Sequence, residues 1–380
     1  MSSHNIYFSG IGLCSPIAGF KDACAAFYAG LNRFDTFDTM ANQSEDAVNI
    51  SIAPAATNLE GYQGVAKTVK MLNMAFDDLC DNLKAPLPQN DLCILTAMPE
   101  PQHRQLALTN QQQSWQEQLN SYISMITMPL FNKLAADNPV LSSAPMQWVF
   151  GDRVAFARIL NKAIQLINEG SYQHCLLMVA DSLINRANLD TLQDAQQVKT
   201  DNNPVGFIAG ESAAMILLSN QAIGEHAFSL NIQVASDEST IEQAIAQVEP
   251  QTPDEENEQQ IQLERNLWQG EKLMPLIKQL ISQNYENQWF PRCFSDINGT
   301  EYRAVEFGNL QVKLKQAYPK AYFMQPLIPS LSFGEQGTMT GPLAFACAIA
   351  GMQRGLARHN EMLITLSEQS GKRAAIALRM

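Results

Sequence analysis

Apolar and polar positions alternate along the first half of the chain in a way that predicts strands and helices in turn. Short, mainly apolar runs are typical of buried strands, and apolar residues at helical spacing are typical of helices packed on a sheet. Strands are predicted at residues 5–15, 91–99, 174–184 and 211–220. Helices are predicted at residues 20–31, 65–83 and 154–170.

The same alternation begins again after Asn220. Strands are predicted at residues 227–236, 291–299 and 320–325, helices at 263–284, 302–318 and 337–357, and a closing hairpin at 361–369 and 372–380. Each half ends with a buried helix, a strand and a final antiparallel strand, which indicates a duplication. We therefore expect an α/β protein with two halves, residues 1–220 and 221–380, and a Gln-rich helical insertion at about 102–145 in the first.

Composition and charge narrow the function. The chain has 380 residues and a net charge of −13, which argues against nucleic acid or an anionic membrane as a partner. It has no apolar run of roughly 20 residues and no signal-peptide pattern at its start, so a cytoplasmic protein is predicted. The acidic tract at residues 249–264 is interpreted as a solvated loop.

The cysteines and histidines indicate no metal site. Seven cysteines are scattered singly and five histidines show no ligand spacing, so buried reduced thiols are expected, and neither a metal nor a cofactor.

A charged pair stands at the start of the helix predicted at residues 154–170, which is apolar on almost every side. Arg153 cannot act as a nucleophile, because its guanidinium stays protonated. A cation at the positive end of a helix dipole also needs an anionic partner. Asp152 is expected to cap the helix by accepting from its backbone amides.

Five segments, taken in order, resemble the β-ketoacyl synthases of the thiolase-like superfamily. They lie at residues 6–34, 175–184, 203–218, 294–308 and 332–352, and the likeness extends over essentially the whole chain. The first contains a Gly-x-Gly-x-x-Ser-Pro turn motif, and the fourth reads Asp-x-Asn-Gly-x-x-Tyr-Arg-x-x-Glu. The resemblance implies a five-layered αβαβα thiolase-like fold built from two pseudo-symmetric halves.

The resemblance also implies where the catalytic residues would lie. Such enzymes use a cysteine at the start of the buried helix, two histidines and a lysine. In this sequence Arg153 stands in the cysteine position, Asn298 and Glu335 in the histidine positions and Ser330 in the lysine position. The chain is thus predicted to be a divergent relative whose catalytic residues are replaced.

These replacements predict specific contacts. Arg153 is expected to pair with Glu335, or otherwise with Asp296 or Glu306. In the segment after residue 295, Asp296 is interpreted as tying the loop, with Arg303 and Glu306 in ion pairs; a polar ligand pocket is the alternative. The predicted degenerate active-site pocket consists of Asp152, Arg153, Asp296, Asn298, Arg303, Glu306, Ser330 and Glu335.

The leading hypothesis is a catalytically inactive protein that acts by binding another protein. The resemblance implies a homodimer, or a heterodimer with a ketosynthase-like subunit, formed through residues 174–184 and 144–150. The chain would then be a chain-length-factor-like partner, or an adaptor or chaperone-like accessory, for example of a type VI secretion effector.

Two other hypotheses remain. Asp152, Glu335 and Ser330 could form an acid–base set of an acyl-thioester enzyme with non-standard chemistry in fatty acid or polyketide biosynthesis. A binder of acyl chains or of carrier protein without turnover would need a basic patch, for which Lys67, Lys70 and Arg104 are the candidates.

Overall fold

The computed structural model describes residues 6–38, 49–55, 59, 61–100, 115–248, 253–284, 292–318, 326–356 and 361–380. The strand predicted at residues 320–325, the start of the predicted insertion and Arg104 lie outside these ranges.

Strands and helices follow one another in the described parts of both halves. The first half contains β1 (Ile6–Cys14), α1 (Phe20–Tyr28), β2 (Asp35–Asp38), β3 (Asn49–Ala53), α2 (Gly64–Leu83), β4 (Leu92–Met98), α3 (Trp115–Tyr122), η3 (Ile123–Thr127), α4 (Met128–Asp137), η4 (Pro139–Leu141), β5 (Met146–Phe150), α5 (Val154–Asn168), β6 (His174–Ser182), α6 (Arg186–Asp194) and β7 (Ala209–Ser219). The second contains β8 (Phe228–Asp237), α7 (Ile241–Val248), α8 (Pro253–Trp268), α9 (Leu273–Asn284), β9 (Arg292–Ser295), α10 (Glu301–Ala317), α11 (Ser330–Phe333), η5 (Gly337–Met339), α12 (Thr340–Gln353), β10 (Glu361–Ser367) and β11 (Arg373–Arg379).

The strand order is the same in both halves. It is β5-β4-β6-β7-β1 in the first and β9-β10-β11-β8 in the second. β4 and β6 are parallel, as are β9 and β10, whereas β7 runs antiparallel to β6 and β1, and β11 runs antiparallel to β10 and β8. A parallel bridge joins Phe294 of β9 to Leu327. Leu327 therefore lies beside β9 as β5 lies beside β4 in the first half. The two halves are therefore pseudo-symmetric, as predicted.

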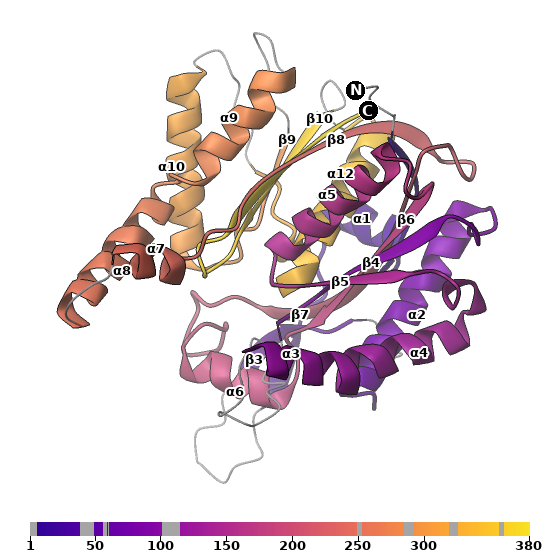
Figure 1. Ribbon diagram of the computed structural model, residues 1–380. Coiled ribbons are helices and arrows are strands. Elements are labelled where there is room, and N and C mark those ends of the chain that lie inside the picture. Colours follow the sequence, from indigo (N-terminus) through magenta and orange to yellow (C-terminus); the bar gives the residue numbers. More distant parts are fainter. Residues whose placement is uncertain are drawn as a thin grey trace.

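The helices and sheets form five layers (Figure 1). α1, α5 and α12 lie between the two sheets, α2 and α4 cover the outer face of the first, and α9 and α10 cover the outer face of the second. Each face of each sheet packs into an apolar cluster, and the middle layer holds the largest. α12 is buried from Thr340 to Met352, which explains why its sequence is apolar on every side.

The two sheets are joined edge to edge. Residues Ile6–Phe8 of β1 pair antiparallel with Phe228–Leu230 of β8, and on its other side β1 pairs with β7 from Tyr7 to Cys14. A small hairpin, β2 with β3, extends the first sheet from β7. Neither β2 nor β3 was predicted from the pattern of apolar residues.

The Gly-x-Gly-x-x-Ser-Pro motif does not begin as a turn. Gly10 and Gly12 both lie inside β1, where α2 crosses the strand at close range. A Cβ atom at Gly12 would lie 2.0 Å from the backbone oxygen of Ala75, so the glycine is required by a close approach of two backbones. The turn comes only after Cys14.

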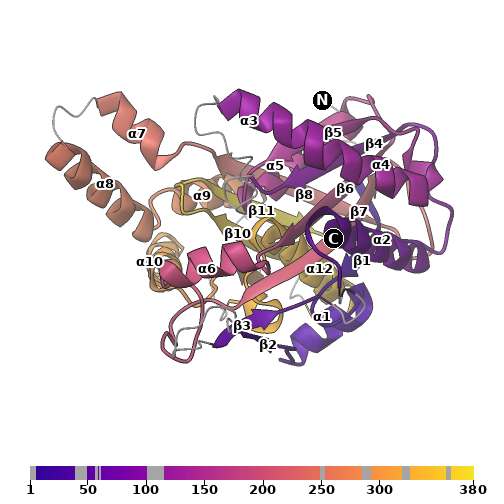
Figure 2. The same ribbon diagram turned by 90° about the horizontal axis from the view of Figure 1, so that it is seen from below.

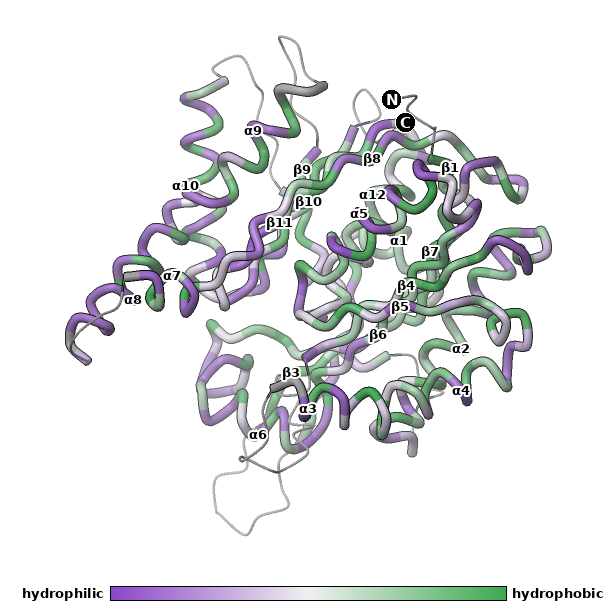
Figure 3. The backbone as a smooth tube through the Cα atoms, in the orientation of Figure 1, coloured by the Kyte–Doolittle hydropathy of each residue, from purple (hydrophilic) through white to green (hydrophobic). Residues whose placement is uncertain are grey.

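The described part of the acidic tract, predicted to be a loop, is helical, because residues 253–264 lie in α8. Pro253 at its first position and acidic residues in its first turn favour helix initiation. The helix lies at the periphery in two perpendicular views and is mostly hydrophilic, in contrast to β7 (Figures 1, 2 and 3). The single helix predicted at residues 263–284 is instead divided near Gly270, whose φ of 71° ends α8.

Among the described residues, no helix combines the length and the apolar character needed to cross a membrane.

Candidate functional site

The site is built around Arg153 at the amino terminus of α5. The chain leaves β5 at Phe150, turns at Gly151 and Asp152, and enters the helix with Arg153 as its N-cap residue. The Arg153 side chain is only 8 % exposed. Its Nη2 atom lies 2.6 Å from Oε1 of Glu335, and its Nη1 atom lies 2.9 Å from Oδ2 of Asp152. The predicted ion pair between Arg153 and Glu335 is therefore present.

Glu335 is held by donors on both of its carboxylate oxygens. Besides Arg153, Oε1 accepts from the Gly337 amide at 2.8 Å and the Thr340 hydroxyl at 3.4 Å, and Oε2 accepts from Nδ2 of Asn298 at 2.6 Å. Burial raises the pKa of Glu335, but the charges of Arg153 and Arg303 lower it by a larger amount, so that the pKa lies below its usual value. The group therefore stays ionised at neutral pH.

Arg153 is the cationic counterpart of this cluster. Burial lowers the pKa of the guanidinium, whereas the carboxylates of Asp152 and Glu335 raise it by more. The resulting pKa is well above its usual value. Arg153 thus remains a cation, and the two carboxylates compensate its charge at the positive end of α5.

The expected cap by Asp152 is replaced by a cap from the far end of the chain. The Val154 amide donates to Oε1 of Glu368 at 2.9 Å, and no side-chain cap bond forms at the N-cap residue. Asp152 is instead engaged by Arg153. Burial raises the pKa of Glu368, and the neighbouring Asp152 carboxylate raises it further. Two carboxylates therefore contact the guanidinium, and a third accepts from the Val154 amide of the first helical turn.

Asn298 and Ser330 differ in their relation to the cluster. Asn298 bonds to Glu335 and accepts from the Thr300 amide and hydroxyl at 3.1 and 2.7 Å, which fixes the loop before α10. Ser330 donates its hydroxyl to the carbonyl oxygen of Ile297 at 2.6 Å. It therefore supports the backbone beside Asn298.

Asp296, Arg303 and Glu306 form ion pairs next to the cluster. Nη1 of Arg303 lies 2.8 Å from Oδ2 of Asp296, which also accepts from the Ser367 amide at 2.6 Å. Glu306 binds Arg373 through two bonds of 2.7 and 3.0 Å. These contacts agree with the interpretation of this segment as loop-tying ion pairs. They also occupy Asp296 and Glu306, the two alternative partners that were considered for Arg153.

A cavity of about 570 Å³ opens onto this cluster. Side chains from both halves line it, among them Asp152, Arg153, Asn298, Tyr302, Glu335 and Glu368. No cysteine, histidine or lysine stands in its wall, as far as the described residues show. Arg153, Asp152 and Glu335 bind one another, apolar side chains such as Leu183, Val205 and Phe207 stand beside them, and the described wall offers no thiolate or imidazole.

Two glycines near the site, Gly206 and Gly210, allow neighbouring groups to approach closely. A Cβ atom at Gly206 would lie 2.2 Å from the carbonyl carbon of Val198, and one at Gly210 would lie 2.7 Å from the carbonyl oxygen of Phe333. Glu211 accepts from the Ser182 hydroxyl at 2.7 Å.

Sequence reasoning missed Glu368 and Arg373 as parts of the site. Arg373 is almost fully buried, and besides Glu306 it binds the carbonyl oxygens of Glu368 and Lys372 at 2.6 and 2.9 Å. The available signal was the segment at residues 366–375, where charged residues stand in place of the glycine-rich loop that the resemblance implies.

Comparisons with known proteins identify the fold. No protein-family model matches the sequence, and no curated protein matches it either. Solved structures do match. A structure described as the ishigamide ketosynthase/chain length factor is 13 % identical with a TM-score of 0.66, and 99 % of each chain is covered.

Two further structures give the same result. A type II polyketide synthase acyl-carrier protein in complex with its ketosynthase is 9 % identical with a TM-score of 0.68, and the whole of each chain is covered. The ketosynthase from module 6 of the bacillaene synthase of Bacillus subtilis is 11 % identical with a TM-score of 0.64 over 98 % of this chain and 72 % of that one. The chain therefore has the thiolase-like fold of ketosynthases and chain length factors.

Proposed function

We propose that this chain is a non-catalytic subunit with a ketosynthase fold, which acts by associating with a ketosynthase-like protein in the manner of a chain-length factor. The observation that carries the proposal is the buried Arg153–Glu335 pair at the amino terminus of α5. The resemblance places the nucleophilic cysteine there. A guanidinium has no lone pair available for attack on a thioester.

The groups around Arg153 support a non-catalytic role. Glu335 is ionised and already accepts from four donors, so it has neither a proton to give nor a free lone pair directed at a substrate. The hydroxyl of Ser330 is bound to a backbone carbonyl. These contacts argue against the acid–base set of Asp152, Glu335 and Ser330 in the alternative enzymatic hypothesis.

The middle layer behind the site is filled with aromatic side chains. Phe156 of α5 and Phe345 of α12 are fully buried and pack edge to face, with ring centroids 5.8 Å apart. A Cβ atom at Gly341 would already lie 2.7 Å from the Phe156 ring. Such close packing between the two central helices leaves little room for an acyl chain at this point.

The association surface that the fold offers is the edge of the first sheet. Of the two predicted segments, β6 at residues 174–182 has no free edge, because it is paired with β4 on one side and β7 on the other, whereas residues 144–150 include β5. Within the described part of the chain, β5 pairs only with β4. The Gly151 amide and the Pro145 carbonyl oxygen point to β4, so that the intervening Trp148 directs its N–H and C=O groups outward. A free edge of this kind pairs readily with another strand.

Lys67, one of the basic residues considered for carrier-protein binding, is less suitable than the sequence suggests. Nζ of Lys67 lies 2.5 Å from Oε2 of the buried Glu211, and its side chain is only 16 % exposed. Its charge is therefore already compensated within the protein. This contact favours a ketosynthase-like partner over a carrier protein as the primary ligand of this chain.

Incubation with malonyl- or acyl-carrier protein, followed by mass spectrometry of the intact protein, tests the absence of catalysis. We expect no acyl adduct and no release of carbon dioxide, with an active ketosynthase assayed in parallel as the positive control. A covalent adduct, or carbon dioxide release above the protein-free rate, would contradict the proposal.

Affinity purification from the native host identifies the partner. Recovery of a ketosynthase-like subunit is expected for a chain-length-factor-like role. Recovery of a secretion effector instead would establish the adaptor version, which would use the same β5 edge for a different partner.

A further inference from the structure

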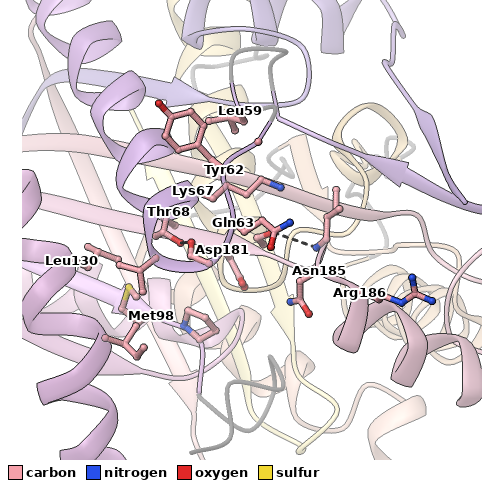
Figure 4. Close-up of a pocket in the computed structure, with 18 of the residues that line it drawn as sticks. Leu59, Tyr62, Gln63, Lys67, Thr68, Met98, Leu130, Asp181, Asn185 and Arg186 are labelled. Carbon is pink, nitrogen blue, oxygen red and sulfur yellow. Dashed lines mark hydrogen bonds between the residues drawn. The ribbon is translucent and has the colours of Figure 1, made fainter. Parts of the chain in front are cut away.

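A second and larger cavity lies on the outer side of the first sheet, away from Arg153. Its volume is about 860 Å³, which falls in the range of small-molecule pockets. It is enclosed by the first turns of α2, by η3 and α4, and by the carboxyl ends of β4 and β6. Figure 4 shows Leu130 and Met98 on one side of it, and Asn185 and Arg186 on the other.

The cavity is separate from the Arg153 site. Among the residues that the structure describes, none lines both cavities. The segment after β6 divides them, because Ser182 and Ile184 line the outer cavity whereas Leu183 lines the other. A ligand bound here would not reach the amino terminus of α5, so the inference stands apart from the proposed function.

The wall of this cavity is mainly apolar. Leu59, Met98, Leu130 and Ala180 belong to the buried outer cluster of the first sheet and also face the cavity. The ring of Tyr122 lines it as well, fixed against Phe150 at a centroid distance of 5.7 Å. An apolar ligand would therefore meet a rigid, already packed surface.

Two charged groups of the described wall are compensated within the protein. Lys67 is bound to Glu211, whose other oxygen accepts from the Ala55 amide at 3.3 Å. Oδ2 of Asp181 accepts from the Thr338 amide at 2.8 Å. Arg186 forms a solvent-exposed pair with Asp190, at 3.7 Å. A charged group bound beside Lys67 and Asp181 would therefore lose its hydration without gaining a free partner.

We propose that this cavity binds an uncharged, mainly apolar molecule that carries a hydrogen-bonding group. The hydroxyls of Thr68 and Ser182 donate to the Gly64 carbonyl oxygen and to Glu211, so their oxygens can only accept from a ligand, and the amide of Gln63 adds a neutral group to the wall. The volume suits a ligand of the size of a medium-length fatty alcohol or a comparable lipophile.

Fluorescence titration of the full-length chain with N-phenyl-1-naphthylamine, an uncharged lipophilic probe, tests the proposal. We expect saturable binding, and displacement by dodecanol at a concentration about tenfold lower than by dodecanoate, which has the same chain but a charged end. Absence of saturable binding, or equal displacement by the two competitors, overturns the proposal.

Two neighbouring substitutions locate the probe. Ile126→Trp fills the cavity and should weaken probe binding at least about tenfold. Met125→Trp adds the same ring at the preceding residue, which is 60 % exposed and does not line the cavity, so binding should be unchanged. Equal affinities of the two variants would place the probe elsewhere and overturn the proposal.

A second filling variant covers a loss of folding in the first. Thr68→Phe, on the first turns of α2, narrows the same cavity from the opposite wall. Circular dichroism shows which variants are folded. If Ile126→Trp is unfolded, the probe affinity of Thr68→Phe is compared with that of Met125→Trp instead, and equal affinities would again overturn the proposal.

Discussion

Arg153 is an unusual residue to find buried at the amino terminus of a helix, because the helix dipole and the loss of hydration both disfavour a cation there. Its environment offsets both effects. Glu335 and Asp152 lie within 2.9 Å of the guanidinium, and Glu368 takes the amide of the next residue. The arrangement makes each of these groups dependent on the others, so removal of one leaves a buried charge without its partner.

Replacing Arg153 should therefore destabilise the protein strongly. We expect Arg153→Met to lower the free energy of unfolding by about 3–5 kcal/mol, because Glu335 would remain buried and ionised. The double variant Arg153→Met/Glu335→Gln should lose less than the sum of the single variants, by about 0.5–3 kcal/mol. Urea denaturation gives all of these values.

Arg158 on the same helix provides the control. It lies 3.3 Å from Glu238, and both side chains are well exposed, so Arg158→Met should cost only about 0–1 kcal/mol. A loss for Arg153→Met no greater than that for Arg158→Met would show that the buried pair contributes little.

The pH dependence of stability should distinguish two buried glutamates. The pKa of Glu335 is lowered, so its contribution is complete above the unfolded-state pKa of about 4.3 and is lost as pH falls through the folded pKa. The pKa of Glu368 is raised, so its contribution is complete below that unfolded-state value and is lost as pH rises through the folded pKa.

The loss of stability caused by Glu335→Gln should therefore be greatest near neutral pH and smaller near pH ~3. The loss caused by Glu368→Gln should change in the opposite direction, being greater in acid than at neutral pH. Denaturant midpoints measured across this pH range compare the two variants. A parallel pH course for both would contradict the assigned directions.

At the scale of elements, α2 crosses β1 so closely at Gly12 that no Cβ atom fits between the two backbones. Gly12 meets the backbone of α2, whereas Gly10, two residues earlier on the same face, meets only the end of the Leu79 side chain at 3.0 Å. A side chain can rotate away, but a helix backbone moves only as a whole.

Gly12→Ala should accordingly cost at least about 3 kcal/mol, and Gly10→Ala about 1 kcal/mol. Thermal or urea denaturation of the two variants provides the comparison. Similar losses would mean that α2 can shift outward at little cost.

The elements that the sequence predicted well are those with their own local signal. The periodicity of α2, the apolar run of β6 and the closing hairpin of β10 and β11 all follow from neighbouring residues. β2 and β3 are short and half polar, so they lack such a signal. α8 was mistaken for a loop because its charges indicate exposure, which a surface helix and a loop share.

The site could be predicted only in part for a related reason. The Arg153–Glu335 pair follows from two positions that the resemblance singled out. The cap of Val154 by Glu368 joins residues 214 positions apart, and nothing local in the sequence marks it. Asp152 was predicted as the cap from its position next to the helix, but its carboxylate forms an ion pair with the adjacent Arg153 guanidinium, which is the stronger interaction.

For the whole molecule, the fold is retained at 9–13 % identity to ketosynthase structures, with TM-scores of 0.64–0.68. The layer architecture depends on apolar patterning, which many sequences satisfy, whereas the reacting groups of a catalytic centre are few and specific. A chain can therefore lose the reacting groups while it keeps the layer architecture, including the edge strand β5.

Association through β5 should depend on its outward backbone groups. We expect the wild-type chain of 42.1 kDa to form a dimer, with itself or with its partner, and Trp148→Pro to abolish it by removing the outward N–H. Trp148→Phe retains that N–H and should still dimerise. Size-exclusion chromatography with light scattering gives the masses, and a dimer that survives Trp148→Pro would place the interface elsewhere.

The apolar middle layer has a consequence for biosynthesis. Its cluster combines α1 and α5, from the first half, with α12, β10 and β11, which lie between residues 340 and 379. Until the ribosome has translated these residues, the apolar faces of α1 and α5 that pack against them stay exposed to solvent. The nascent chain should thus rely on holding chaperones until α12, β10 and β11 have emerged, and a product shortened before α12 should aggregate.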